Sequence, residues 1–227
     1  MDSVTFGFIG TGRVAKHYQK IMNSGLVKNF KVISCCDLNK DSTAAFSSNC
    51  TSAVEVYEKV EDLLEQTPPE LAIICTPSGL HYEHAKLALT KNCNVLVEKP
   101  SSLIPSQSEE LVKLANSKGL LYSVCYQNRF NPAIMKLKST LGEGRFGRIT
   151  TATIRLRWCR YQSYYNDEWH GTWAQDGGVI NQQAIHHIDI LNWLLGPIDS
   201  VCSATNNSLN VLEAEDTIIK GDADTFH

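Results

Sequence analysis

The sequence predicts an α/β fold, with a doubly wound parallel sheet in the first half of the chain and a second α/β domain after it. Three observations lead to this prediction. Apolar runs of strand length alternate with amphipathic helical patterns through the first half. The first run ends in a glycine-rich turn that opens a helix. Further along, β-branched residues alternate with basic ones. We therefore expect one domain at residues 1–122 and a second at residues 123–227.

Each element is predicted from its residue pattern. In the first domain we expect strands at 4–10, 30–37, 71–75, 95–98 and 120–125. The expected helices lie at 14–24, from 41 onward, and at 60–66, 82–91 and 106–118. In the second domain we expect a strand over 146–158, a helix over 181–195, and short strands near 199–205 and 215–220.

Bulk composition is that of an ordinary globular protein, with 43% hydrophobic and 20% charged residues. The 21 basic and 24 acidic residues give a net charge of −3, which does not favour nucleic acid or an acidic membrane as a partner. We expect no signal peptide and no membrane span. Eight cysteines include no C-x-x-C pair, and several fall in apolar runs. This favours a cytoplasmic protein with reduced thiols over a disulfide framework.

The glycine motif Gly10-x-Gly12-x-x-Ala15 lies between the first strand and the first helix. In that context, free backbone N–H groups at the helix start can hold a pyrophosphate. The alternative is that the glycines serve only a tight turn. Asp37 ends the next strand, where a carboxylate binds ribose hydroxyls and repels a 2′-phosphate, so we expect NAD rather than NADP. The candidate cofactor residues of this region are Gly10, Thr11, Gly12, Arg13, Val14 and Asp37.

Two later strand ends carry further candidates. Thr76, Pro77 and His81 follow the strand at 71–75, beside the expected nicotinamide crevice, although a turn and helix cap would use the same residue types. Glu98 and Lys99 end the strand at 95–98 and precede a proline. A partly desolvated lysine there would suit the handling of a hydroxyl proton and the stabilisation of an alkoxide. The alternative is a strand end with solvated charges.

The helix expected over 181–195 carries Gln182 and His186 on one face and Gln183 and His187 on a neighbouring face. Periodicity alone leaves open which histidine points at a substrate. Zinc is a poor interpretation, because adjacent histidines diverge and no H-E-x-x-H spacing completes a site.

In this order, FIGTGRVA, TPSGLH, EKP and a glycine turn before a histidine-bearing helix resemble the glucose–fructose oxidoreductase/inositol dehydrogenase (Gfo/Idh/MocA) family. The resemblance implies a Rossmann domain, then an α/β domain whose open, mostly antiparallel sheet mediates homo-oligomerisation. It also implies that Lys99 and His186 flank the reacting hydroxyl, and that Pro100 is commonly cis.

Within that family, YQNRFNP at 126–132, RWCR at 157–160 and WHGTW at 169–173 resemble UDP-N-acetylglucosaminuronate 3-dehydrogenases. This implies oxidation of a sugar C3 hydroxyl with NAD, in the synthesis of surface polysaccharides such as lipopolysaccharide. Arginine forks suit the diphosphate and the carboxylate of such a substrate, although a basic strand face would look the same. The resemblance adds Gln127 at the cofactor. The candidate substrate residues are Lys99, Asn128, Arg129, Arg157, Gln182, Gln183 and His186.

Two departures from the family pattern keep alternatives open. Gln182 stands where relatives often carry an acidic residue or Asn, and a shift of one position would put Asn181 there instead. Relatives are also usually longer, so we expect the second domain to be incomplete at His227. The alternatives are a dehydrogenase of a free sugar or inositol, and a catalytically silent NAD-binding protein.

Overall fold

The computed structural model describes residues 3–158 and 160–204. The chain divides into two compact units, Met1–Cys125 and Tyr126–His227. Among the described residues, every helix is too short or too polar to span a lipid bilayer.

The first unit is built on a six-stranded sheet in the order β3-β2-β1-β4-β5-β6. The strands are β1 (Val4–Ile9), β2 (Phe30–Cys36), β3 (Glu55–Tyr57), β4 (Leu71–Ile74), β5 (Asn94–Glu98) and β6 (Tyr122–Cys125). All neighbouring pairs run parallel. The strand order reverses between β1 and β4, as in dinucleotide-binding Rossmann folds. The predicted doubly wound parallel sheet is therefore confirmed.

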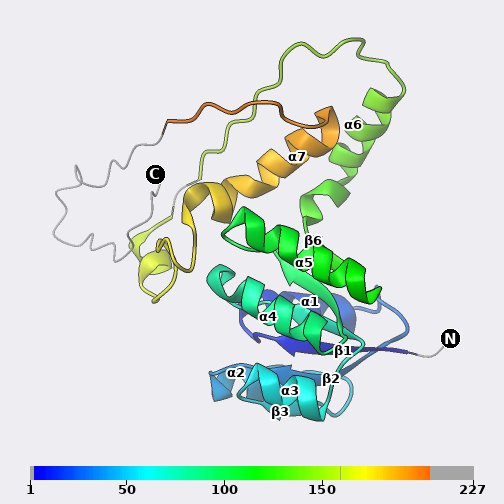
Figure 1. Cartoon of the computed structure of the whole chain (residues 1–227), viewed down its shortest axis with the longest axis vertical. Coiled ribbons are helices and arrows are strands. Elements are labelled where there is room, and N and C mark those ends of the chain that lie inside the picture. Colours follow the sequence, from blue (N-terminus) through cyan, green and yellow to red (C-terminus); the bar gives the residue numbers. More distant parts are fainter. Residues whose placement is uncertain (1–2, 159, 205–227) are drawn as a thin grey trace. The chain divides into compact units, whose positions relative to one another are not determined.

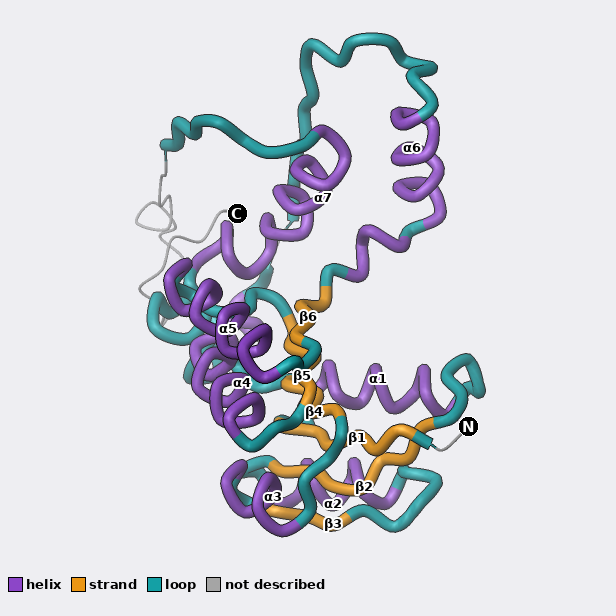
Figure 2. The backbone as a smooth tube through the Cα atoms, turned by 45° about the vertical axis from the view of Figure 1, so that its right-hand side comes forward, coloured by secondary structure: helices purple, strands orange, loops and turns teal. Residues whose placement is uncertain are grey.

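Helices cover both faces of this sheet (Figures 1 and 2). One face carries α1 (Arg13–Asn23) and α2 (Lys40–Ser48), and the other carries α3 (Val60–Gln66), α4 (His81–Thr90) and α5 (Pro105–Lys118). Local sequence sets the helix ends. The Asn39 side chain accepts the Ser42 N–H at the start of α2, and Gly119, with φ +65°, ends α5.

Each face of the sheet has its own apolar core. Phe8 of β1 packs against Phe46 of α2, with ring centroids 4.9 Å apart, and both side chains are fully buried. On the other face, Ile74 of β4 belongs to a cluster with Leu89 and Leu111. A fully buried side chain of this size contributes about 1.5–3 kcal/mol. The two cores therefore hold the helices against the two faces of the sheet.

The second unit contains α6 (Pro132–Gly142) and α7 (Ile185–Leu195). A π-helical turn at Ile180–Ala184 leads directly into α7, so the helix expected over 181–195 is present with an unusual first turn. Short 3-10 turns lie at Gln127–Phe130 and Gln162–Tyr165. Single π-helical turns inside longer helices are frequent at functional sites.

Two strand predictions for the second unit are wrong. Residues 146–158 and 199–204 form no strand within the part of the chain that the structure describes. Alternating β-branched residues favour an extended backbone, but a strand also needs a neighbour that pairs with its N–H and C=O groups. The described residues supply no such neighbour, so the expected antiparallel sheet is not formed among them. The expected strand at 215–220 lies outside the described residues.

Candidate active site

The carboxyl ends of the central strands meet at one edge of the first unit's sheet. Ile9 of β1 lies opposite Cys36 of β2 and Ile74 of β4, and Ile74 lies opposite Val97 of β5. Residues that end or follow these strands therefore share an edge, at the point where the strand order reverses. The candidates at this edge are Gly10, Asp37, Thr76, Pro77, Glu98 and Lys99.

The two glycines of the turn have different structural roles. Gly10 has φ +87°, and a Cβ there would lie 2.8 Å from backbone atoms of Cys75 and Thr76, so only glycine fits. Gly12 is the N-cap of α1, and a Cβ there would meet nothing within 4 Å. The first turn of α1, which includes exposed Arg13 and Val14, contains no acidic residue. Its uncapped N–H groups and the open space at Gly12 fit a pyrophosphate.

Asp37 follows β2, and the glycine turn holds its carboxylate. Its Oδ2 accepts the Thr11 backbone N–H at 2.8 Å and the Thr11 hydroxyl at 3.2 Å. Its Oδ1 accepts the Asn39 N–H at 2.9 Å. The prediction that Thr11 contacts the cofactor needs correction, because Thr11 is fully buried and its N–H is bound to Asp37. Thr11 instead orients the carboxylate that is expected to meet the ribose.

The candidate residues that follow β4 differ in their burial and in their hydrogen-bond partners. Thr76 and Pro77 are half-buried, and the Thr76 hydroxyl lies 3.1 Å from Nδ1 of His84. His81 begins α4, and its side chain is only 1% exposed. Its ring nitrogens lie 2.6 Å from the Pro100 carbonyl oxygen and 2.8 Å from the Thr76 carbonyl oxygen. The predicted cofactor contact by His81 is therefore wrong in this geometry, since the imidazole faces the backbone.

At the end of β5, Glu98 and Lys99 are both half-buried. Glu98 accepts the Tyr18 hydroxyl at 2.9 Å and, more weakly, the Lys99 N–H at 3.3 Å. Burial, followed by the charge of Glu98, raises the pKa of Tyr18, so its hydroxyl stays protonated and keeps donating. The Lys99–Pro100 peptide bond is cis. Sequence reasoning missed Tyr18, although it lies on α1 within one turn of Ala15, the last residue of the fingerprint.

In the second unit, His186 lies on α7 and packs edge-on against Tyr126, with ring centroids 6.4 Å apart. One turn further along α7, Asp189 forms a two-point ion pair with Arg129, and the bond from Arg129 Nε measures 2.7 Å. This hydrogen bonding raises the pKa of Arg129. Arg129 also lies over the ring of Trp193, 5.8 Å from its centroid. The Arg129 guanidinium, which was expected to bind the substrate, is therefore bound to Asp189. Arg129 thereby anchors the helix that carries His186.

The remaining candidates of the second unit have distinct surroundings. Gln182 is buried, and Gln183 donates to the Tyr164 hydroxyl at 3.1 Å. Asn181 donates to the Gly177 carbonyl, one turn back along the chain, at 3.0 Å. Arg157 is exposed on the extended segment. Of the other predicted contacts, the side chain of Asn128 is half-buried and that of Gln127 is exposed.

Arg160, Trp158 and Tyr164 form an aromatic and basic cluster in the second unit. The sequence motif at 157–160 indicated the first two of these residues but not their contact with Tyr164. The Arg160 guanidinium lies 3.8 Å from the centroid of the Trp158 ring and 5.0 Å from that of Tyr164. Arginine both lies on aromatic faces and binds phosphate groups, so this cluster suits an anionic ligand. Among the described residues, no three His, Cys, Asp or Glu side chains are grouped in a way that could hold a metal ion.

Several known proteins resemble this chain. The WlbA dehydrogenase from Bordetella pertussis, solved in complex with NADH and UDP-GlcNAcA, superposes with a TM-score of 0.81 at 31% identity, over 86% of this chain and 56% of that one. D-glucoside 3-dehydrogenase of Escherichia coli is 27% identical over 83% of this chain and 53% of its own length. The scyllo-inositol 2-dehydrogenase (NADP(+)) IolW of Bacillus subtilis is 29% identical over 76% and 46%. The chain thus spans about half the length of the curated relatives it matches.

Two family models match along the chain. The model described as the oxidoreductase family, NAD-binding Rossmann fold, matches residues 4–126, and the GFO/IDH/MocA C-terminal domain model matches residues 134–219. The first match alone covers more than half of the sequence. This chain belongs to the Gfo/Idh/MocA family of oxidoreductases.

Proposed function

We propose that the chain is an NAD-dependent dehydrogenase that oxidises a secondary hydroxyl, at C3, of a UDP-linked N-acetylated sugar uronate. The observation that carries this proposal is the likeness to WlbA, at 31% identity, in a structure that holds NADH and UDP-GlcNAcA. The residues at the sheet edge fit that chemistry.

The first unit supplies a suitable cofactor site. The open space at Gly12 and the uncapped start of α1 would accept the pyrophosphate. Asp37 would bind the ribose hydroxyls through Oδ1, which has a second lone pair beyond the one used by Asn39, whereas Oδ2 already accepts two bonds from Thr11. A fixed carboxylate at that position repels a 2′-phosphate, which favours NAD over NADP.

The proposed chemistry divides between the two units. The bound nicotinamide would accept the hydride that leaves the sugar carbon. His186 would take the hydroxyl proton, and the ammonium of Lys99 would stabilise the negative charge that develops on the oxygen. The carbon loses two electrons and one hydrogen as hydride, and its hydroxyl loses a proton, so the product is a ketone. Arg129 would keep His186 in place through Asp189 rather than bind the sugar.

A second candidate is the same oxidation on a free sugar or an inositol. The sequence relatives from Escherichia coli and Bacillus subtilis favour it, since their names specify a glucoside and scyllo-inositol. Arg160, which lies over Trp158 and Tyr164, favours the nucleotide-linked sugar, because a guanidinium suits a diphosphate. A cytoplasmic role in surface-polysaccharide synthesis and a homo-oligomeric assembly are part of the same proposal.

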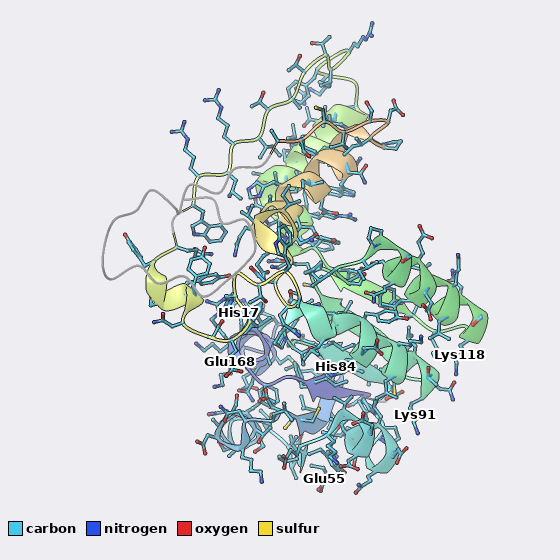
Figure 3. The ribbon with its side chains drawn as sticks, turned by 60° about the vertical axis from the view of Figure 1, so that its left-hand side comes forward. His17, Glu55, His84, Lys91, Lys118 and Glu168 are labelled. Carbon is cyan, nitrogen blue, oxygen red and sulfur yellow. The ribbon has the colours of Figure 1, made fainter. Side chains whose placement is uncertain are left out.

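Nicotinamide fluorescence tests the proposal. The purified chain is mixed with NAD and UDP-GlcNAcA, and in parallel with UDP-GlcNAc, a glucoside or scyllo-inositol. We expect NADH only with UDP-GlcNAcA, and we expect Lys99→Ala to abolish it. Lys91→Ala is the matched control, because Lys91 lies at the far end of α4 and forms an exposed ion pair with Glu65 at 2.7 Å (Figure 3).

Two other outcomes would replace the leading proposal. NADH formation from scyllo-inositol or the glucoside alone would replace the leading substrate by the second candidate. Binding of NADH without turnover of any substrate would favour the silent NAD-binding protein.

A further inference from the structure

His81 is a buried histidine that the proposed reaction does not use. It is the first residue of α4, and only 1% of its surface is exposed. Nδ1 lies 2.6 Å from the carbonyl oxygen of Pro100, and Nε2 lies 2.8 Å from that of Thr76. These carbonyls belong to the segments that follow β5 and β4, so a single ring bridges two neighbouring strand ends.

The two partners restrict the protons on the ring. A carbonyl oxygen only accepts hydrogen bonds, and a neutral imidazole has one N–H to donate. Burial, the largest effect, lowers the pKa of His81, although both carbonyls and Glu98 oppose that change and Lys99 adds to it. His84, on the same helix, is a further titratable neighbour. At neutral pH the ring is therefore neutral, and only one of the two contacts is a full hydrogen bond.

The shorter contact favours the Pro100 carbonyl as the one that accepts the N–H. Hydrogen bonds shorten as they strengthen, and the Nδ1 contact is the shorter of the two. The backbone of Lys99 lies directly between two anchors: Glu98, whose carboxylate accepts the Tyr18 hydroxyl, and Pro100, whose carbonyl faces His81. Losing the contact at Pro100 would remove one of these two anchors on either side of the lysine.

We infer that His81 is a positioning residue for Lys99: its neutral ring carries the proton on Nδ1 and donates to the Pro100 carbonyl, which sets where the lysine stands. The catalytic part of this inference rests on the proposed function. The placement of the ring proton on Nδ1 does not depend on the proposed function.

Two amide substitutions separate the two contacts. The amide nitrogen of His81→Asn overlies Nδ1 and can still donate toward Pro100, whereas that of His81→Gln overlies Nε2 and reaches toward Thr76. Both variants remove the ring, so both lose similar packing. In turnover of UDP-GlcNAcA we expect kcat of His81→Asn to stay within about tenfold of the original chain, and kcat of His81→Gln to fall on the order of a hundredfold. The dissociation constant for NADH should change little in either variant.

His17→Gln is the control, because His17 is an exposed histidine on α1, on the opposite face of the sheet from α4 (Figure 3). An equal loss of kcat in the Asn and Gln variants, or a greater loss in His81→Asn, would overturn the inference. A ¹⁵N NMR spectrum of the full chain gives a readout that needs no substrate. The His81 signal is assigned by its absence in His81→Asn. A proton on Nδ1 at neutral pH supports the inference, and a proton on Nε2 overturns it, whether or not the chain oxidises the sugar.

Discussion

Gly10→Ala and Gly12→Ala form a matched pair, because the same added methyl group should damage different properties at the two positions. At Gly10 the new Cβ would lie 2.8 Å from backbone atoms of Cys75 and Thr76, which cannot rotate away as a side chain would. The residue also has φ +87°, which costs an L-amino acid about 1–2 kcal/mol. Overpacking adds about 1–3 kcal/mol. Gly10→Ala should therefore lower the free energy of unfolding by about 2–5 kcal/mol.

At Gly12 the same methyl group enters open space, and φ is −68°, which alanine readily adopts. Alanine is a poorer N-cap than glycine, but it also reduces the entropy of the unfolded chain, and the two effects nearly cancel within about 1 kcal/mol. The new Cβ would nonetheless occupy the place where the pyrophosphate approaches the backbone. We expect Gly12→Ala to weaken NADH binding on the order of a hundredfold, or about 2.7 kcal/mol.

Far-UV circular dichroism in urea is the appropriate stability assay. All four tryptophans, at positions 158, 169, 173 and 193, lie in the second unit, so their fluorescence would not report on the glycine turn. NADH binding is followed by the cofactor's own fluorescence. Unchanged NADH affinity in Gly12→Ala would refute the pyrophosphate site, and a Gly10→Ala variant as stable as the original chain would refute the argument from close approach.

Two further predictions concern charge. Burial lowers the pKa of His84 to about 4, so the unfolded chain takes up a proton before the folded chain does as the pH falls. Stability should therefore fall between about pH 6.5 and pH 4, by at most about 3 kcal/mol from this group, and His84→Gln should flatten the decline in urea titrations. A pH-independent midpoint would contradict this. Arg129→Lys should cost the second unit about 2–4 kcal/mol by breaking the two-point pair with Asp189, whose side chain is only 9% exposed. Arg145→Lys, whose exposed pair with Glu143 measures 3.6 Å, should cost under about 1 kcal/mol; equal losses of tryptophan-monitored stability would argue against the anchoring role.

The parallel sheet was predictable because its information is local. Each central strand is an apolar run bounded by a helix start, and the glycine turn marks which strand comes first. The segment at 146–158 shows where such reasoning fails. Its alternation favours an extended backbone, but strand formation depends on a pairing partner elsewhere in the chain, which the pattern of the segment does not contain.

Side-chain roles in the site were harder to predict than the residues themselves. His81 follows the loop that was expected to face the cofactor, yet its ring turns toward Pro100, 19 residues further along the chain. Arg129 was expected to face the substrate, yet it pairs with Asp189, 60 residues away. A sequence motif identifies a residue type that suits a ligand, but a carboxylate or carbonyl brought near by the fold competes for the same donor.

This competition for hydrogen-bond donors affects which residues can select the substrate. In the first unit, hydrogen bonds within that unit hold the turn, Asp37 and the Lys99 segment. Relatives whose names specify a glucoside and scyllo-inositol match the same chain. On the proposed function, we expect the choice between such substrates to depend on the second unit. Arg129 is bound to Asp189, so the other cations there that could meet an anionic substrate include exposed Arg157, and Arg160, which lies against Trp158. Substitutions at these two arginines should change which sugar is oxidised while leaving NADH binding intact.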